Sequence, residues 1–110
     1  MMNITDVRLL LRNYNHLKNN DNYLKITYLI DEALKEAGDE TATIVKELYF
    51  KKNPVLFYCG ENYLSQSGVY RKMRKFCESL LIRILTSGKI SDFAKETADL
   101  LRGLTKSHNI

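Results

Sequence analysis

Apolar residues recur at helical spacing along the chain, and few residues interrupt them. The 110 residues include one proline and five glycines, the residue types that most often end helices. Between them, apolar positions repeat every three or four residues, and the strict alternation of a β-strand is weak. The sequence therefore predicts an all-α fold, a compact bundle of about six helices.

Three helices are predicted before residue 51. The first covers about residues 5–17, the second runs from Asp21 or Asn22 as N-cap to Gly38, and the third begins near Asp39. Their expected inward residues are Val7, Leu10, Leu11, Tyr14 and Leu17, then Ile26, Leu29, Ile30, Ala33, Leu34 and Ala37, then Ile44, Val45, Leu48 and Tyr49.

Three more helices are predicted after residue 52. Asn53 and Pro54 match an N-cap followed by proline at the first helical position of a short helix that ends near Asn62. Ser65 is expected to cap a helix over 66–85, and Ser91 to open the last helix over 91–104, with residues 105–110 frayed. The expected inward residues of these last two helices are Val69, Met73, Phe76, Cys77, Leu80 and Ile84, then Phe93, Thr97, Leu100, Leu101 and Leu104.

The chain length predicts one domain over 1–110, because 110 residues suffice for one hydrophobic core but not two. We divide it into N-terminal helices (1–41), a helix-turn-helix unit (42–85) and a C-terminal helix (91–104). That last helix can close the core or form a dimer contact. Closing the core is the simpler alternative, because a lone amphipathic helix in a small domain usually packs within it.

Positive charge is concentrated in the middle of the chain. Residues 1–50 hold six Lys/Arg and eight Asp/Glu, residues 51–90 hold eight and two, and residues 91–110 hold three and three. A basic segment in an otherwise neutral or acidic chain is what a polyanion-binding surface needs. A solvated lysine-rich face would look the same, so charge alone leaves both interpretations open.

The sequence predicts a short helix, a turn, and then a longer helix that Ser65 opens. In a helix-turn-helix with this arrangement, the second helix enters the DNA major groove. The first turn and a half of that helix would read bases, which points to Gln66, Ser67, Tyr70 and Arg71. The candidates for phosphate contacts are Lys51, Lys52, Lys72, Arg74 and Lys75.

The stretch TIVKELYFKKNPVLFYCGENYLSQSGVYRKMRKFCESLLIRI, residues 43–84, resembles the C-terminal half of the RinA and ArpU group of phage late-gene activators, itself similar to DNA-binding region 4 of sigma factors. The resemblance rests on a helix ending in Tyr49-Phe50 and lysines, a short helix, Leu64-Ser65, and the run VYRKMRK. It implies a sequence-specific regulator of phage or prophage genes that activates transcription. Two residues depart from the pattern. Asn62 stands where the second helix of the family usually turns an apolar residue inward. Gly68 lies in the first turn of the recognition helix, where glycine weakens a helix by about 0.5–1 kcal/mol relative to alanine.

Double-stranded DNA is therefore the expected partner, with RNA polymerase and a second copy of the chain as further candidates. A protein-binding adaptor that works without DNA is the main alternative. It is favoured by eleven aromatic residues, seven of them tyrosine, because tyrosine and arginine are enriched at interfaces. Most of these aromatics are expected in the core, namely Tyr14, Tyr28, Tyr49, Phe50, Phe57, Phe76 and Phe93.

Catalysis is not expected. His16 and His108 lack neighbouring Cys, Asp or Ser in a catalytic or zinc-binding pattern, carboxylates are scattered, and there is no glycine-rich phosphate loop. We predict no metal and no cofactor. Cys59 and Cys77 are expected to be buried free thiols. No apolar run reaches the roughly 18 residues of a membrane span, and the N-terminus does not read as a secretory signal, so we expect a cytoplasmic protein.

Overall fold

The computed structural model of the chain describes the backbone of residues 1–108 and the side chains of residues 1–104. Within that range the chain is mostly helical and has no strand, which confirms the predicted all-α class. The α-helices are α1 (Ile4–Arg12), α2 (Tyr14–Lys18), α3 (Leu24–Ala37), α4 (Asp39–Val45), α5 (Val55–Asn62), α6 (Gln66–Leu85) and α7 (Lys89–His108). A 3₁₀ turn η1 (Asp21–Tyr23) leads into α3, and a π-helical turn η2 (Lys46–Phe50) continues α4.

Two of the predicted boundaries follow directly from local chemistry. Gly38 adopts φ 88° between α3 and α4, a left-handed φ that glycine tolerates best. Ser65 caps α6 as predicted, since its Oγ accepts a hydrogen bond from the Gly68 N–H at 3.1 Å.

Three predicted details of the first predicted helix and of α5 are wrong. The first helix is broken into α1 and α2 at Asn13. The Asn13 side chain donates a hydrogen bond to the Leu9 carbonyl at 2.8 Å, and so competes with the backbone hydrogen bonds of the helix. Pro54 is the N-cap of α5 and not its first helical residue, because it is extended (φ −61°, ψ 139°). The Asn53 side chain does not cap α5 and instead donates to Glu47 Oε2 at 2.5 Å.

The last helix begins two residues earlier than predicted and buries a different stripe. It begins at Lys89, and its buried residues include Ala94, Thr97, Ala98 and Leu101. Leu100 and Leu104, which we expected inward, are exposed at 56% and 51%. They lie off the buried face of α7, which carries Ala94, Thr97, Ala98 and Leu101. The backbone of α7 reaches His108, and the rest of the predicted fraying over 105–110 lies outside the described residues.

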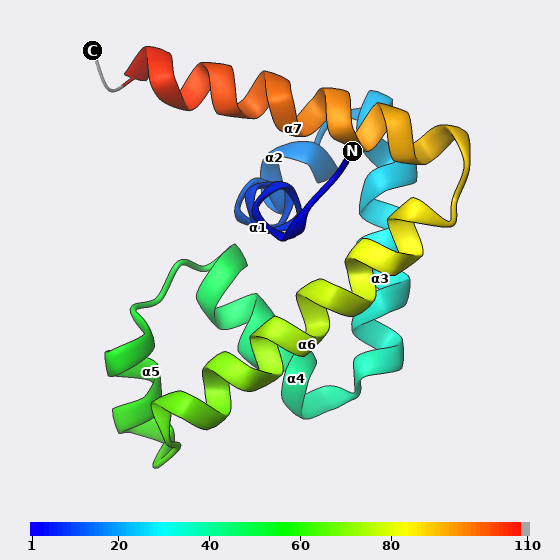
Figure 1. Ribbon diagram of the computed structural model, residues 1–110. Helices are drawn as coiled ribbons and strands as arrows, with labels where there is room; N and C mark the ends of the chain where they lie inside the picture. Colours follow the sequence, from blue (N-terminus) through cyan, green and yellow to red (C-terminus); the bar gives the residue numbers. More distant parts are fainter. Residues whose placement is uncertain (109–110) are drawn as a thin grey trace.

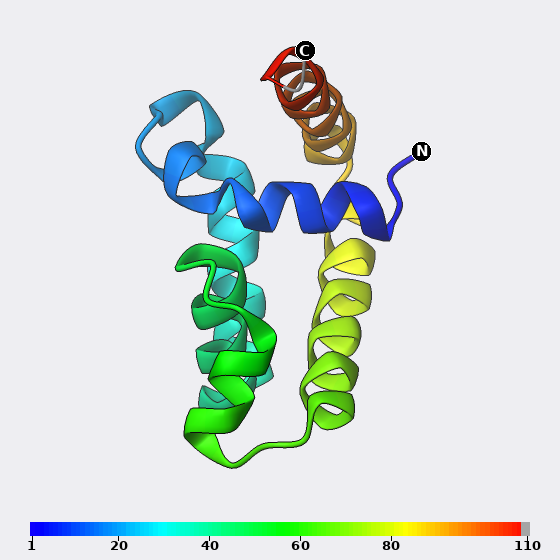
Figure 2. The same ribbon diagram turned by 90° about the vertical axis from the view of Figure 1, so that its left-hand side faces the viewer.

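The helices form two levels (Figures 1 and 2). In Figure 2, α3, α4 with η2, and α6 stand roughly upright, α1 lies across their upper ends, and α7 lies beyond α1 at the top. The α1 helix packs on α7, α6 and η2, and α3 packs on α6 and α4. The α5 helix and the beginning of α6 lie at the end of the molecule farthest from α7 (Figure 1).

Two apolar clusters hold these levels together. The larger one draws residues from α1, α2, α3, α4, η2, α6 and α7, so α7 closes one side of the core. The smaller one contains Ile44, Leu48, Cys59 and Val69, with Val55, Tyr58 and Met73 packed against them. The continuous helix of α4 and η2 serves both clusters, because Val45 and Tyr49 face the larger and Ile44 and Leu48 the smaller. The smaller cluster fixes α5 against α4, η2 and α6.

Of the seven aromatics expected in the core, five are buried or half-buried. Tyr14, Tyr49 and Phe76 are buried, and Phe50 stacks on Tyr14 with ring centroids 4.0 Å apart. Phe93 is half-buried and stacks on Tyr23. Tyr28 and Phe57 are exposed at 62% and 56%, because each lies on the outer face of its helix.

Candidate nucleic-acid interface

The α5 helix is joined to α6 by a tight turn of three residues, 63–65. Tyr63 ends α5 in the left-handed conformation (φ 56°, ψ 40°), and the Leu64 N–H donates to the Cys59 carbonyl at 3.0 Å. Asn62, which departs from the family pattern by being polar, is exposed and donates its side-chain amide to the Tyr58 carbonyl at 2.9 Å. A short helix, a tight turn and a long helix thus follow one another in the predicted order.

Gly68, the other departure from the family pattern, has a local explanation. A Cβ built at residue 68 would lie 2.9 Å from Ser65 Oγ, closer than real Cβ contacts. That oxygen is the one that caps α6. Glycine at residue 68 therefore leaves room for the serine cap, at the cost in helix propensity noted above.

The four predicted base-reading residues lie on the first turn and a half of α6 and are open to solvent. Gln66, Ser67 and Arg71 are exposed, and Tyr70 is 52% exposed. The opposite face of the same helix is anchored by Val69 in the smaller cluster. The helix therefore presents these side chains outward from a fixed base.

The five predicted phosphate-binding residues fall into two groups. Three are already ion-paired: Lys51 with Glu47 at 3.0 Å, Arg74 with Glu78 at 3.4 Å, and half-buried Lys72 with Glu40 of α4. Lys52 and Lys75 are exposed and have no ion pair among the described residues. The same holds for Arg71 among the base-reading candidates.

Surface ion pairs of this kind are weak, typically about 0–1 kcal/mol, so they can be exchanged for a phosphate. Lys51 and Asn53, by their hydrogen bonds, lower the pKa of the Glu47 carboxyl below its usual value. Lys72 differs from the others because Glu40 draws it toward α4, away from the outward face of α6.

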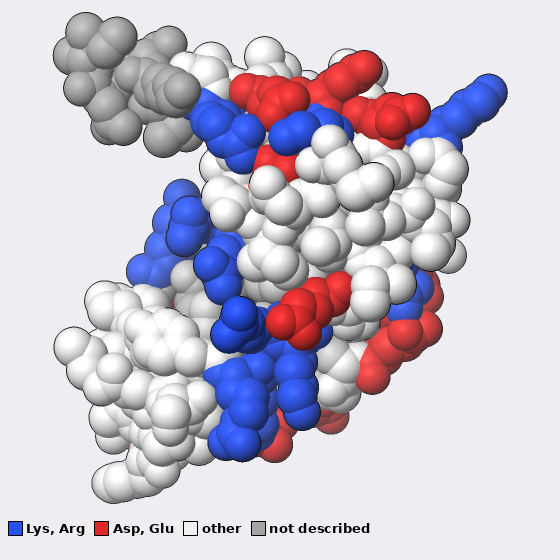
Figure 3. All heavy atoms as spheres, viewed as in Figure 1, with Lys and Arg blue, Asp and Glu red and all other residues white. Residues whose placement is uncertain are grey.

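The basic residues of α6 form one patch of the surface (Figure 3). Lys and Arg side chains gather over α6 in this view, next to an uncharged region over α5. They continue along the left of the view toward α1, where the surface is hollowed between the lobe of α5 and the upper level. The patch is therefore wider than one helix.

Two arginines that the sequence analysis missed, Arg8 and Arg12, belong to α1, which packs on α6 and η2. Both are close enough to the Tyr49 hydroxyl to influence its pKa, and Arg8 lies beside the Cys77 thiol of α6. Burial is the main reason why the pKa of Tyr49 is raised to about 12, and the two arginines oppose it. The basic signal of residues 51–90 could not reveal them, because they belong to a segment with excess acid.

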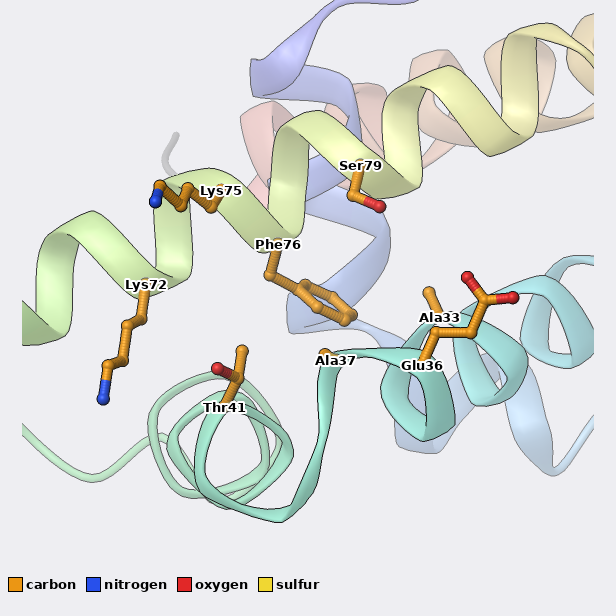
Figure 4. A pocket seen from close by; sticks show the side chains of 8 residues that line it. All are labelled: Ala33, Glu36, Ala37, Thr41, Lys72, Lys75, Phe76 and Ser79. Carbon is orange, nitrogen blue, oxygen red and sulfur yellow. The ribbon is translucent and has the colours of Figure 1, made fainter.

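The other flank of α6 borders a hollow of about 320 Å³ between α3, α4 and α6 (Figure 4). The Phe76 ring points from α6 toward the corner of α3 and α4, with Lys72 and Lys75 on the α6 side and Glu36 on the α3 side. The charged groups at its rim include Glu36, which pairs with Arg83, and Lys72, which pairs with Glu40. This arrangement offers no pair of groups suited to acid–base or nucleophilic chemistry.

A set of exposed apolar side chains lies on α5, on the turn that follows it and at the start of α6, and we call it the α5 apolar surface. It consists of Leu56 (69% exposed), Phe57 (56%), Tyr63 (96%), Leu64 (36%) and Tyr70 (52%). Two of these residues, Leu56 and Phe57, belong to the apolar run VLFYC (residues 55–59), in which helical spacing alone does not separate the buried Cys59 from its exposed neighbours.

The described residues lack the features of a metal site, a disulfide and a membrane helix. No group of three His, Cys, Asp or Glu residues lies close enough to hold a metal ion. Cys59 and Cys77 are buried free thiols, as predicted. No helix in the described range has the length and apolarity to cross a membrane.

Comparison with known proteins gives no family assignment: no family model matches the chain, and searches of curated proteins and solved structures find no significant match. The resemblance of residues 43–84 to the phage activators therefore stays a prediction.

Proposed function

We propose that the protein is a sequence-specific, double-stranded DNA-binding regulator of transcription, and that α4, α5 and α6 act as its helix-turn-helix. The observation that carries this proposal is the outward face of α6. Exposed Gln66, Ser67, Arg71 and Lys75 lie on a helix whose inner face is fixed by two apolar clusters. Arg71 and Lys75 form no ion pair with any described residue, so their charge is available to a polyanion.

In this mechanism the first turn and a half of α6 enters the major groove. Arg71 can donate two hydrogen bonds to a guanine edge, and Gln66 can pair with adenine in the same way. Ser67 and Tyr70 would contact neighbouring base edges or a thymine methyl group. The rigid support matters, because base readout requires side chains to be held in one register.

Phosphate contacts would then fix the protein on the duplex. Lys75 and Arg74 lie one turn farther along α6, and Lys51 and Lys52 precede α5. Lys72 is the weakest of the predicted phosphate ligands, since it is half-buried and paired with Glu40. Such contacts release condensed counterions, which makes binding strongly dependent on salt.

The resemblance to phage late-gene activators extends the proposal to activation of phage or prophage genes in the cytoplasm. Activation by this route would involve contact with RNA polymerase. A homodimer would bind a two-fold symmetric site.

The test is binding of the purified protein to a randomised duplex library across a salt titration. An Arg71→Ala/Arg74→Ala double variant is compared with Lys25→Ala/Lys89→Ala, which removes the same charge at exposed residues of α3 and α7. We expect the wild type to select a preferred sequence, with a steep fall in affinity as salt increases. The α6 variant should lose at least about tenfold in affinity for that sequence, while the control keeps the preference.

Absence of duplex binding even at about 50 mM salt would refute DNA binding. Equal losses in the two double variants would show that only net charge matters, and would refute base reading by α6.

The α5 apolar surface favours a second candidate, the adaptor that grips a protein partner without DNA. Exposed Leu56, Phe57 and Tyr63 are unusual on the outside of a small protein, since contiguous apolar patches often mark protein contacts. The candidates for that partner are a polymerase subunit or another regulator. Leu56→Gln/Phe57→Gln distinguishes the two functions, because it should abolish partner capture by an adaptor but leave duplex binding by α6 intact.

A further inference from the structure

The position of α1 on α6 suggests that the DNA contact extends beyond the helix-turn-helix unit. The α1 helix buries Asp6, Val7, Leu10 and Leu11 and packs on α6, α7 and η2. Arg8 and Arg12 are four residues apart, so they lie one above the other on the same flank of α1. Arg12 is exposed and Arg8 is half-buried.

Arg8 and Arg12 follow Asp6 by two and six residues, so they lie on the side of α1 away from Asp6, which pairs with α7. The α1 helix packs on η2 and on α6, whose Tyr49 hydroxyl and Cys77 Sγ lie 3.8 Å apart. Arg8 and Arg12 both lower the pKa of the Tyr49 hydroxyl, and Arg8 also lowers that of the Cys77 thiol, which agrees with this placement. The sequence places Arg8 and Arg12 more than fifty residues from α6, and the fold brings them next to it.

The charge of this flank is not neutralised within the molecule. No described carboxylate forms an ion pair with Arg8 or Arg12. The one acidic residue of α1, Asp6, is buried and pairs with Lys95 and Arg102 of α7. The one acidic residue of α6, Glu78, is paired with Arg74.

The α1 flank lies farther along α6 than the base-reading residues. Cys77 follows Arg71 by six residues, which is about 9 Å along the helix axis at 1.5 Å per residue. A recognition helix reads bases with its N-terminal residues, so groups beside its later turns are closer to the DNA backbone than to the base edges. In Figure 3 the basic patch continues from α6 toward α1 without an intervening acidic area along the left of the view.

We propose that Arg8 and Arg12 of α1 form a second phosphate-binding element that holds the backbone of the same duplex whose groove receives α6. A DNA backbone suits this surface better than an acidic protein segment, because the patch is continuous with the base-reading face and contains no apolar anchor of its own. The inference rests on the proposed function and adds to it a contact outside residues 42–85. Phosphate contacts of this kind strengthen binding to all sequences alike and set the orientation of the recognition helix.

The experiment compares Arg8→Gln/Arg12→Gln with wild type, with Arg71→Ala/Arg74→Ala and with the Lys25→Ala/Lys89→Ala control, by titrating a preferred and a scrambled duplex over a range of salt concentrations. We expect the α1 variant to lose affinity for both duplexes by the same factor and to keep its preferred sequence. The slope of log affinity against log salt should flatten by about 1.8, at about 0.9 for each lost phosphate contact. The charge-preserving Arg8→Lys/Arg12→Lys variant should keep the wild-type slope.

Arg8 is half-buried beside Cys77, so the double variant can be destabilised for reasons unrelated to DNA. Arg12→Gln alone avoids this, because Arg12 is exposed, and it should flatten the slope by about 0.9. A wild-type slope in Arg12→Gln, in a protein that binds DNA and loses binding in the α6 variant, would overturn the α1 contact and leave the proposed function standing. If the wild type fails to bind DNA, both proposals are refuted.

Discussion

The Asp6 carboxylate joins α1 to α7, and we predict that Asp6→Asn lowers the free energy of unfolding by about 2–3 kcal/mol. Asp6 is fully buried. It accepts hydrogen bonds from the Asn3 backbone N–H at 3.0 Å and the Lys95 ammonium at 3.2 Å, and it pairs with the Arg102 guanidinium. The Asn3 side chain in turn accepts from the Asp6 N–H at 3.0 Å, which completes a capping box.

The magnitude follows from these partners. Removing one member of a buried ion pair costs about 3–5 kcal/mol, because the other charge stays without compensation. Here Lys95 and Arg102 are 30% and 36% exposed, so water can solvate them. Both also contact Asp99, at 3.1 and 3.0 Å. Asparagine keeps the volume and an acceptor for the Asn3 N–H, which places the loss at about 2–3 kcal/mol.

The assay is urea unfolding at pH 7 followed by circular dichroism, with Asp99→Asn as the control. That control removes an exposed carboxylate from the same two cations, so it should cost about 1 kcal/mol or less. The reasoning fails if Asp6→Asn unfolds within about 0.5 kcal/mol of wild type, or if Asp99→Asn costs more than Asp6→Asn.

The same site predicts a pH dependence. Burial raises the pKa of the Asp6 carboxyl, but Arg102, the Asn3 N–H and Lys95 together lower it further, so the folded-state pKa lies below its usual value. A depressed pKa stabilises the fold above the unfolded value, near 3.9, and that contribution is lost as pH falls below it. Wild type should therefore lose stability more steeply than Asp6→Asn below about pH 4. Parallel curves for the two proteins would show that Asp6 is not the group that titrates.

Three further predictions concern α5 and α6. Tyr63→Gly should raise the free energy of unfolding by about 0.5–1 kcal/mol, measured by urea unfolding, because Tyr63 is left-handed and 96% exposed; no gain would show that the tyrosine is not strained there. Gly68→Ala should change the free energy of unfolding by less than about 0.5 kcal/mol, because the gain in helix propensity is offset by displacement of the Ser65 cap. Gly60→Ala has open space around its Cβ, so it should raise the free energy of unfolding by about 0.5–1 kcal/mol. A thiol reagent should modify Cys77 only after unfolding, because burial excludes the reagent and raises the thiol pKa; rapid labelling of the native protein would contradict this.

Local sequence signals predicted the helices with strong end signals. Gly38 marked the end of α3, Ser65 marked the start of α6, and the six residues expected on the inner face of α6 are all buried or half-buried. These features depend on neighbours three or four residues away, which is the range over which helical periodicity carries information.

Features that depend on distant partners were not predictable in this way. Leu100 looked as apolar as Leu101, but α7 buries the face that carries Ala94, Ala98 and Leu101, and this leaves Leu100 exposed. Asp6 looked like an ordinary first-turn acid, and only its pairing with Arg102, 96 residues later, explains why it can be buried. For Asp6 the deciding contact therefore lies between the two ends of the chain.

The candidate site also combines residues that local sequence predicts with residues that only distant packing reveals. Arg71 and Lys75 could be chosen from the sequence because one helix carries both them and the apolar stripe that fixes their direction. Arg8 and Arg12 could not, because the charge count assigned residues 1–50 an excess of acid. The fold separates those charges: Asp6 is buried against α7, Glu36 and Glu40 pair with α6 on its far flank, and no described carboxylate forms an ion pair with Arg8 or Arg12 of α1. Net charge along a sequence therefore underestimates a binding surface whenever packing sorts acids and bases onto different faces.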